Sequence, residues 1–113
     1  MIKNREDLTE KISLKDNEKN HSQFLLNEFN GINEQLKQFS VVELEVGKEI
    51  AYHIQNNDCD MYYIISGKGI YNDNGVEKEV SAGTITFTPS GEGHALKNTG
   101  NDKLVFIALV IED

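Results

Sequence analysis

The chain has 113 residues, which is the usual size of one domain. Its 38% hydrophobic and 27% charged residues are typical of a globular protein and exclude a disordered one. The net charge of −8 argues against anionic partners, so we expect the protein to bind neither nucleic acid nor a membrane surface.

The sequence also limits where the protein can work. No apolar run approaches the roughly 20 residues that a membrane-spanning helix needs. The first ten residues are charged and polar, unlike a signal peptide, so we expect a cytoplasmic location. The single cysteine, Cys59, excludes an internal disulfide.

The first twenty residues differ in composition from the rest of the chain. They are rich in Lys, Glu, Asp and Asn and contain few large apolar side chains. This composition predicts a polar N-terminal arm over residues 1–20, followed by one domain over residues 21–113.

From residue 21 onward the pattern is one of short strands separated by turns. Residues 42–46 alternate apolar and acidic side chains, as a half-buried strand does. Asn74-Gly75 lies between two such runs, and this pair tolerates the positive φ angles of a hairpin turn. The predicted strands cover residues 24–29, 42–46, 50–55, 61–66, 69–71, 76–80, 84–88, 95–98 and 103–111. Many short strands with regular turns predict an all-β sandwich or barrel.

Three of these strands place polar side chains where they can meet. Residues two apart in a strand lie on the same face. The groups that share a face are Ala51, His53 and Gln55, then Asp60, Tyr62 and Ile64, and finally His94, Leu96 and Asn98. Imidazole, amide and carboxylate groups are all metal ligands, so these faces together could surround one ion.

A glycine-rich segment around His94 has a defined spacing. It reads Gly83-x5-Pro89-x-Gly91-x2-His94-x3-Asn98. This segment resembles the second motif of the cupin superfamily at every defined position. His94 stands at the position of a metal ligand in that motif.

A second segment resembles the first cupin motif. It reads Gly47-x5-His53-x-Gln55-x4-Asp60-x6-Gly67, which keeps the spacing of that motif throughout. Together the two segments resemble small single-domain cupins of the oxalate-decarboxylase-like type. The resemblance implies a jelly-roll β-barrel with a divalent metal, commonly Mn, Fe, Ni, Zn or Cu, held by three His and one Glu.

Carried over by position, the resemblance implies that His53, Gln55, Asp60 and His94 are the metal ligands. Gln55 stands where the family has a histidine, and Asp60 stands where it has a glutamate. An amide oxygen is a harder and weaker donor than imidazole, so these changes favour Mn or Fe(II) and lower the affinity. An empty site is the alternative. The residue-level alternatives are a pocket-lining role for Gln55 and a turn-capping role for Asp60.

Three functions are compatible with this pattern. The first is a metal-dependent enzyme, a decarboxylase or a dioxygenase, acting on a small organic acid. The second is a non-catalytic cupin that binds or senses a small ligand with a degenerate metal site. The third is a sugar isomerase or epimerase, because some cupins of that type use Gln as a ligand.

The opposite strand faces predict a partner. Tyr52, Ile54, Met61, Tyr63 and Ile65 point away from the expected barrel interior. An exposed apolar patch of this kind usually marks an interface, so we expect a homodimer.

Overall fold

The computed structural model describes residues 2–15, 19–25 and 33–113, with side chains for residues 2–8 and 33–113. One short 3-10 helix, η1 (Arg5–Asp7), precedes ten strands in these ranges. The strands are β1 (Thr9–Lys15), β2 (Lys19–Leu25), β3 (Leu36–Leu44), β4 (Glu49–Ile54), β5 (Asp58–Ser66), β6 (Lys68–Asp73), β7 (Val76–Ser81), β8 (Ile85–Thr88), β9 (Gly93–Asn98) and β10 (Leu104–Glu112). No described helix is long and apolar enough to cross a membrane.

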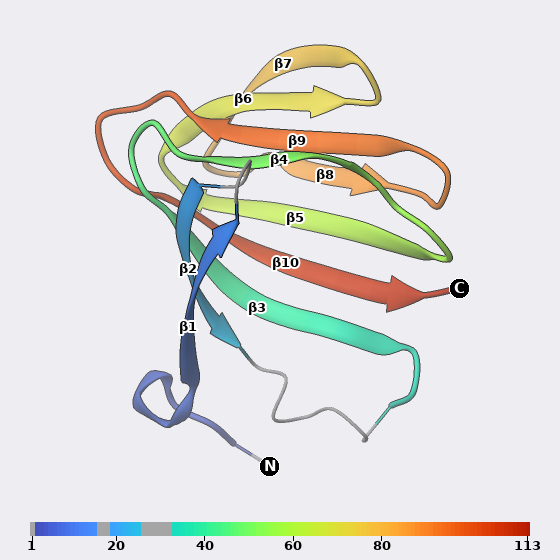
Figure 1. Cartoon of the computed structure of the whole chain (residues 1–113). Helices are drawn as coiled ribbons and strands as arrows, with labels where there is room; N and C mark the ends of the chain where they lie inside the picture. Colours follow the sequence, from blue (N-terminus) through green and yellow to red (C-terminus); the bar gives the residue numbers. More distant parts are fainter. Residues whose placement is uncertain (1, 16–18, 26–32) are drawn as a thin grey trace.

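The strands form two antiparallel sheets that lie one above the other (Figure 1). The larger sheet has the order β1-β2-β3-β10-β5-β8, and the smaller has the order β4-β9-β6-β7. From β3 onward the chain crosses between the sheets at every connection except the β6–β7 hairpin. This is the connectivity of a jelly roll, and it confirms the predicted all-β jelly-roll barrel.

The inward faces of both sheets meet in one apolar core. β3, β5 and β10 supply side chains from the larger sheet, and β4, β6, β7 and β9 supply them from the smaller sheet. The core consists of Val42, Leu44, Ile50, Tyr62, Ile64, Tyr71, Val80, Leu96, Leu104, Phe106 and Ala108. Polar side chains that share these inward faces are therefore held against a packed interior.

Strand β5 shows how alternation positions such a polar side chain. Asp60, Tyr62 and Ile64 are only 6%, 5% and 0% exposed, whereas Tyr63 and Ile65, at alternate positions, are 48% and 44% exposed. The predicted inward and outward faces of this strand are confirmed. The carboxylate of Asp60 is consequently directed into the barrel.

The β6–β7 hairpin closes one edge of the smaller sheet. Asn74 and Gly75 both adopt positive φ, at 51° and 99°, which is the conformation of a type I′ turn. The Asn72 side chain accepts a hydrogen bond from the Gly75 amide at 2.7 Å. The hairpin predicted from Asn-Gly is confirmed. On its other side, β6 pairs with β9, and this register places Tyr71 opposite Leu96.

The N-terminal strands extend the larger sheet. β1 pairs with β2 over seven residues, and β2 pairs in turn with the second half of β3. The boundary predicted at residue 20 falls inside β2, and the division into arm and barrel stays a prediction. The predicted strand over residues 24–29 reaches past the end of β2 into residues outside the described part of the chain.

Candidate metal centre

His94 is the buried centre of the candidate site. It begins the inward face of β9 and is 1% exposed. Its ring stacks on Tyr62 at a centroid distance of 5.2 Å and meets the edge of Tyr71 at 5.7 Å. Its Nδ1 lies 2.7 Å from the Tyr71 hydroxyl, so the ring is fixed on one side and presents Nε2 on the other.

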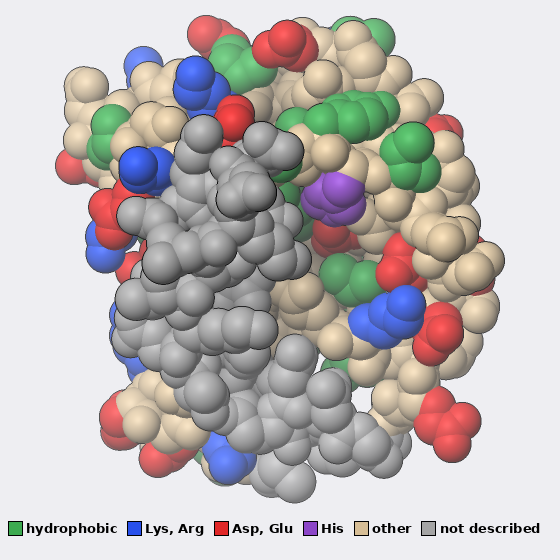
Figure 2. Space-filling model, in the orientation of Figure 1, with side chains coloured by type: hydrophobic (Ala, Val, Ile, Leu, Met, Phe, Trp, Pro, Cys, Tyr) green, Lys and Arg blue, Asp and Glu red, His purple; other side chains and the backbone are tan. Residues whose placement is uncertain are grey.

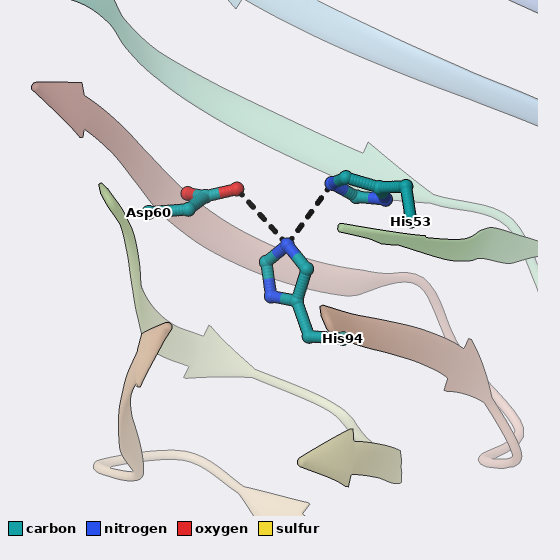
Figure 3. A group of neighbouring side chains, drawn as sticks. All are labelled: His53, Asp60 and His94. Atoms are coloured by element: carbon teal, nitrogen blue, oxygen red, sulfur yellow. Dashed lines mark hydrogen bonds and ion pairs between the residues drawn. The ribbon is translucent and has the colours of Figure 1, made fainter. Parts of the chain in front are cut away.

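His53 reaches the same point from the neighbouring strand β4. It is paired with His94 across the sheet, just after a register shift that begins at Ile50. Its Nδ1 lies 2.9 Å from the carbonyl oxygen of Ala51, which orients the ring. Nε2 of His53 is therefore 3.1 Å from Nε2 of His94 (Figure 3). His53 is the most exposed of the three residues. A histidine is visible at the molecular surface in the view of Figure 2.

Asp60 approaches from the opposite sheet. Its Oδ2 lies 3.2 Å from Nε2 of His94, as the second dashed line of Figure 3 shows. Its other oxygen, Oδ1, is buried and has no hydrogen-bond partner among the described residues. A buried carboxylate oxygen without a partner is costly in a protein interior. A bound cation would compensate for the missing partner, and no described side chain does so.

The three donor groups fit a metal ion. One ligand atom each from His53, Asp60 and His94 lies within 4.8 Å of the other two. Metal–ligand bonds of about 2.1 Å place neighbouring ligand atoms about 3 Å apart in an octahedral site. The separations of 3.1 and 3.2 Å at His94 match that spacing. Two imidazoles and a carboxylate are also a common donor set for divalent transition metals.

Gln55, the fourth predicted ligand, has an amide nitrogen that is engaged outside this group. It is 7% exposed, and its Nε2 donates a hydrogen bond to Oδ1 of Asp58 at 2.7 Å. Asp58 also pairs with Lys37 at 3.1 Å. The Gln55 backbone is bonded to Glu92 and Gly91, so the segment after β4 is tied to the loop before β9. Ligation by Gln55 stays a prediction.

Tyr71 is a site residue that sequence reasoning missed. Its hydroxyl bridges Nδ1 of His94 at 2.7 Å and Oγ1 of Thr88 at 2.8 Å. Burial raises the pKa of the Tyr71 hydroxyl, more than the hydrogen bond with Thr88 lowers it. The group therefore stays a neutral phenol that can donate and accept. Alternation alone places Tyr71 inside the barrel, but gives no sign that a residue of β6 reaches His94.

Comparison with known proteins identifies the family. Residues 40–111 match the cupin domain family, which is more than half of the chain. The chain is a cupin. The matched range contains both glycine-framed segments, residues 47–67 and 83–98, which resemble the two cupin motifs. The resemblance seen in the sequence is therefore confirmed.

This cupin is similar to several known proteins. The chain is 38% identical over 73 residues to an oxalate-binding protein of Thermotoga maritima, an alignment that covers 65% of this chain and 60% of that protein. A crystal structure of a predicted oxalate decarboxylase from Thermotoga maritima superimposes with a TM-score of 0.92 at 27% identity, covering 100% of both chains. The cupin domain of Schizosaccharomyces pombe Cnp3 shares the fold at 16% identity, with a TM-score of 0.75 over 91% of this chain and 69% of that one.

Proposed function

We propose that this cupin binds one divalent metal ion through His53, Asp60 and His94, and through the metal a small dicarboxylic acid such as oxalate. The observation that carries the proposal is the convergence of the three donor groups, all within 4.8 Å of one another. The unpartnered, buried Oδ1 of Asp60 supports it independently. The similarity to an oxalate-binding protein supports the choice of ligand.

Each side chain has a separate task in this proposal. His53 and His94 contribute neutral nitrogen donors, and Asp60 contributes one negative charge, so a divalent metal would keep a net positive charge. Two histidines and one carboxylate leave coordination positions open in an octahedral site. The metal would supply Lewis-acid binding and polarisation of a carboxylate. The amide nitrogen of Gln55 is held by Asp58, and we propose that its oxygen stays outside the coordination sphere, which leaves three protein ligands and a site open to a bidentate acid.

The charges of the chain make the metal necessary for anion binding. The sequence contains a single arginine, Arg5, and its guanidinium pairs with Glu43 at 3.2 Å. No arginine is thus available for bidentate binding of a carboxylate in the barrel. A dianion placed beside the buried carboxylate of Asp60 would be repelled. Oxalate binding is therefore expected to depend on the metal.

The test is to load the chelator-treated protein with Mn²⁺, Fe²⁺, Ni²⁺ or Zn²⁺ and to measure bound metal by elemental analysis. Oxalate binding is then measured by calorimetry on loaded and metal-free protein. We expect one metal per chain and a loss of oxalate affinity of at least about 100-fold without it, as for a buried charge that loses its partner. Equal oxalate affinity with and without metal would overturn the proposal.

Decarboxylation is the second candidate function. It is favoured by the structural similarity to a predicted oxalate decarboxylase over the full length of both chains. Loaded protein incubated with oxalate would release formate and carbon dioxide in stoichiometric amounts if the site turns the acid over. Binding without formate release would leave the role of a metal-dependent binding protein.

We also propose that the protein is a homodimer that pairs through the outer face of the larger sheet. Tyr63 of β5 lies beside Ile85 of β8, and both are exposed, at 48% and 73%. Phe87 lies beside Met61 in the same register and is 57% exposed. Neighbouring apolar side chains on a flat sheet face are typical of an interface between subunits.

Substituting Phe87→Glu is expected to convert the dimer to a monomer, because it places a charge among the apolar side chains of this face. Val76→Glu is the matched control, since Val76 is 58% exposed but lies on β7 of the other sheet. Size-exclusion chromatography with light scattering gives the mass of each. A monomeric wild type at micromolar concentration would contradict the dimer.

A further inference from the structure

The hydrogen bonds around the two histidines determine where their protons lie. Nδ1 of His53 contacts the carbonyl oxygen of Ala51 at 2.9 Å, and a carbonyl oxygen only accepts. Nδ1 of His53 therefore carries the proton, and its Nε2 has a free lone pair. Nε2 of His94 faces that lone pair at 3.1 Å and the Asp60 carboxylate at 3.2 Å. Since both neighbours are acceptors, a neutral His94 is expected to carry its proton on Nε2.

This proton position conflicts with metal binding. A histidine nitrogen coordinates a metal through its lone pair, so Nε2 of His94 must give up its proton when a metal binds there. A neutral imidazole keeps one proton, which then lies on Nδ1. Nδ1 of His94 must consequently change from acceptor to donor.

The partner of Nδ1 is able to follow this change. With the proton of His94 on Nε2, Tyr71 donates to Nδ1 of His94 across 2.7 Å and can accept from Thr88 across 2.8 Å. With the proton on Nδ1, His94 donates to the Tyr71 oxygen, and Tyr71 donates to Oγ1 of Thr88. The proton of His94 passes from Nε2 to Nδ1, the two hydroxyl hydrogens rotate, and the total number of protons is unchanged. A carbonyl or carboxylate partner could serve only the second arrangement.

We propose that Tyr71, together with Thr88, is a positioning pair that accommodates both tautomers of His94 and thereby determines how tightly the metal binds. The inference rests on the proposed metal site and goes beyond its three ligands. A metal-bound imidazole is polarised, so its N–H donates a stronger hydrogen bond than the neutral ring accepts. Loss of the Tyr71 hydroxyl therefore weakens the metal-bound state more than the metal-free state.

The experiment compares Tyr71→Phe and Thr88→Val with the wild type. Zn²⁺ is the probe, because it is diamagnetic and permits ¹⁵N spectra of the histidine rings. Long-range ¹H–¹⁵N correlation spectra of the wild type are expected to show His94 with its proton on Nε2 without metal and on Nδ1 with Zn²⁺. Competition with a chelating dye is expected to show zinc affinity reduced about 10- to 100-fold in Tyr71→Phe, the range found for outer partners of metal-binding histidines.

Thr88→Val keeps the phenol but removes the acceptor for its hydrogen, so a smaller reduction of about 10-fold is expected. Tyr63→Phe removes a phenol from the outward face of β5 and is the matched control with unchanged affinity. Wild-type zinc affinity in both Tyr71→Phe and Thr88→Val would overturn the inference but not the proposed metal site. A His94 ring that carries its proton on Nδ1 in the metal-free protein would do the same. A wild type that binds no zinc would overturn both the inference and the proposed metal site.

Discussion

Alanine at position 94 is expected to abolish metal binding and to destabilise the barrel, whereas alanine at position 53 is expected to abolish metal binding alone. Each histidine supplies one of three donors, so the loss of either leaves too few protein ligands for a stoichiometric site. His94 is in addition 1% exposed and packs against Tyr62 and Tyr71. Its truncation leaves a cavity and removes a partner from both the Tyr71 hydroxyl and the Asp60 carboxylate.

The expected cost of His94→Ala is about 3 kcal/mol, which is typical of truncating a large buried ring. The expected cost of His53→Ala is below about 1 kcal/mol, because His53 lies at the surface and its ring contacts mainly His94. Urea unfolding in the presence of a chelator measures the free energy of unfolding of each metal-free variant. Elemental analysis after metal loading and gel filtration measures the amount of metal bound per chain.

The third histidine, His21, provides the control for binding by any imidazole. It lies outside both glycine-framed segments, so His21→Ala is expected to retain the metal. Full metal content in His94→Ala would contradict the proposed site, and equal stability of the two site variants would contradict the packing role of His94.

The ligand cluster was predictable because its members obey local rules. His53, Asp60 and His94 each lie within a β-strand. Side chains alternate between the two faces of a strand, so the position in the strand decides which face each one takes. Glycine spacing then identified the two segments that bring the strands together. Sequence reasoning could thus place three residues from three strands in one group.

Gln55 and Tyr71 show where local rules end. Gln55 lies just past the end of β4, so strand alternation no longer decides its direction. The side-chain Nε2 of Gln55 instead donates a hydrogen bond to Asp58, three residues further along the turn. Tyr71 approaches His94 only because β6 pairs with β9 in the register that sets Tyr71 opposite Leu96. Such a register between strands distant in sequence is a tertiary property that one strand's pattern does not encode.

Asp60→Asn is expected to separate stability from binding, because it removes a charge without changing shape. The side chain is 6% exposed, and one of its two oxygens has no partner among the described residues. Desolvating a carboxylate costs several kcal/mol in practice, and the contact with His94 compensates for it only in part. The metal-free variant is therefore expected to melt at a higher temperature than the metal-free wild type.

The same substitution is expected to reduce metal affinity by at least about 100-fold, since a neutral amide replaces the only anionic ligand. A metal at 100 times its dissociation constant stabilises a folded protein by about 2.7 kcal/mol. Thermal melts with and without metal should then show a clear increase for the wild type and a much smaller one for Asp60→Asn.

Asp58→Asn is the matched control for this argument. Both oxygens of Asp58 are engaged, one by Gln55 and one by Lys37, so removing its charge weakens existing contacts. That variant is expected to keep the metal-induced stabilisation and to gain no stability without metal. If metal-free Asp60→Asn instead melted below the wild type, the contact of Asp60 with His94 would outweigh the desolvation of the carboxylate. Asp60 would then be explained as a structural partner of His94, whereas the expected increase would show that its burial is tolerated for the sake of a bound cation.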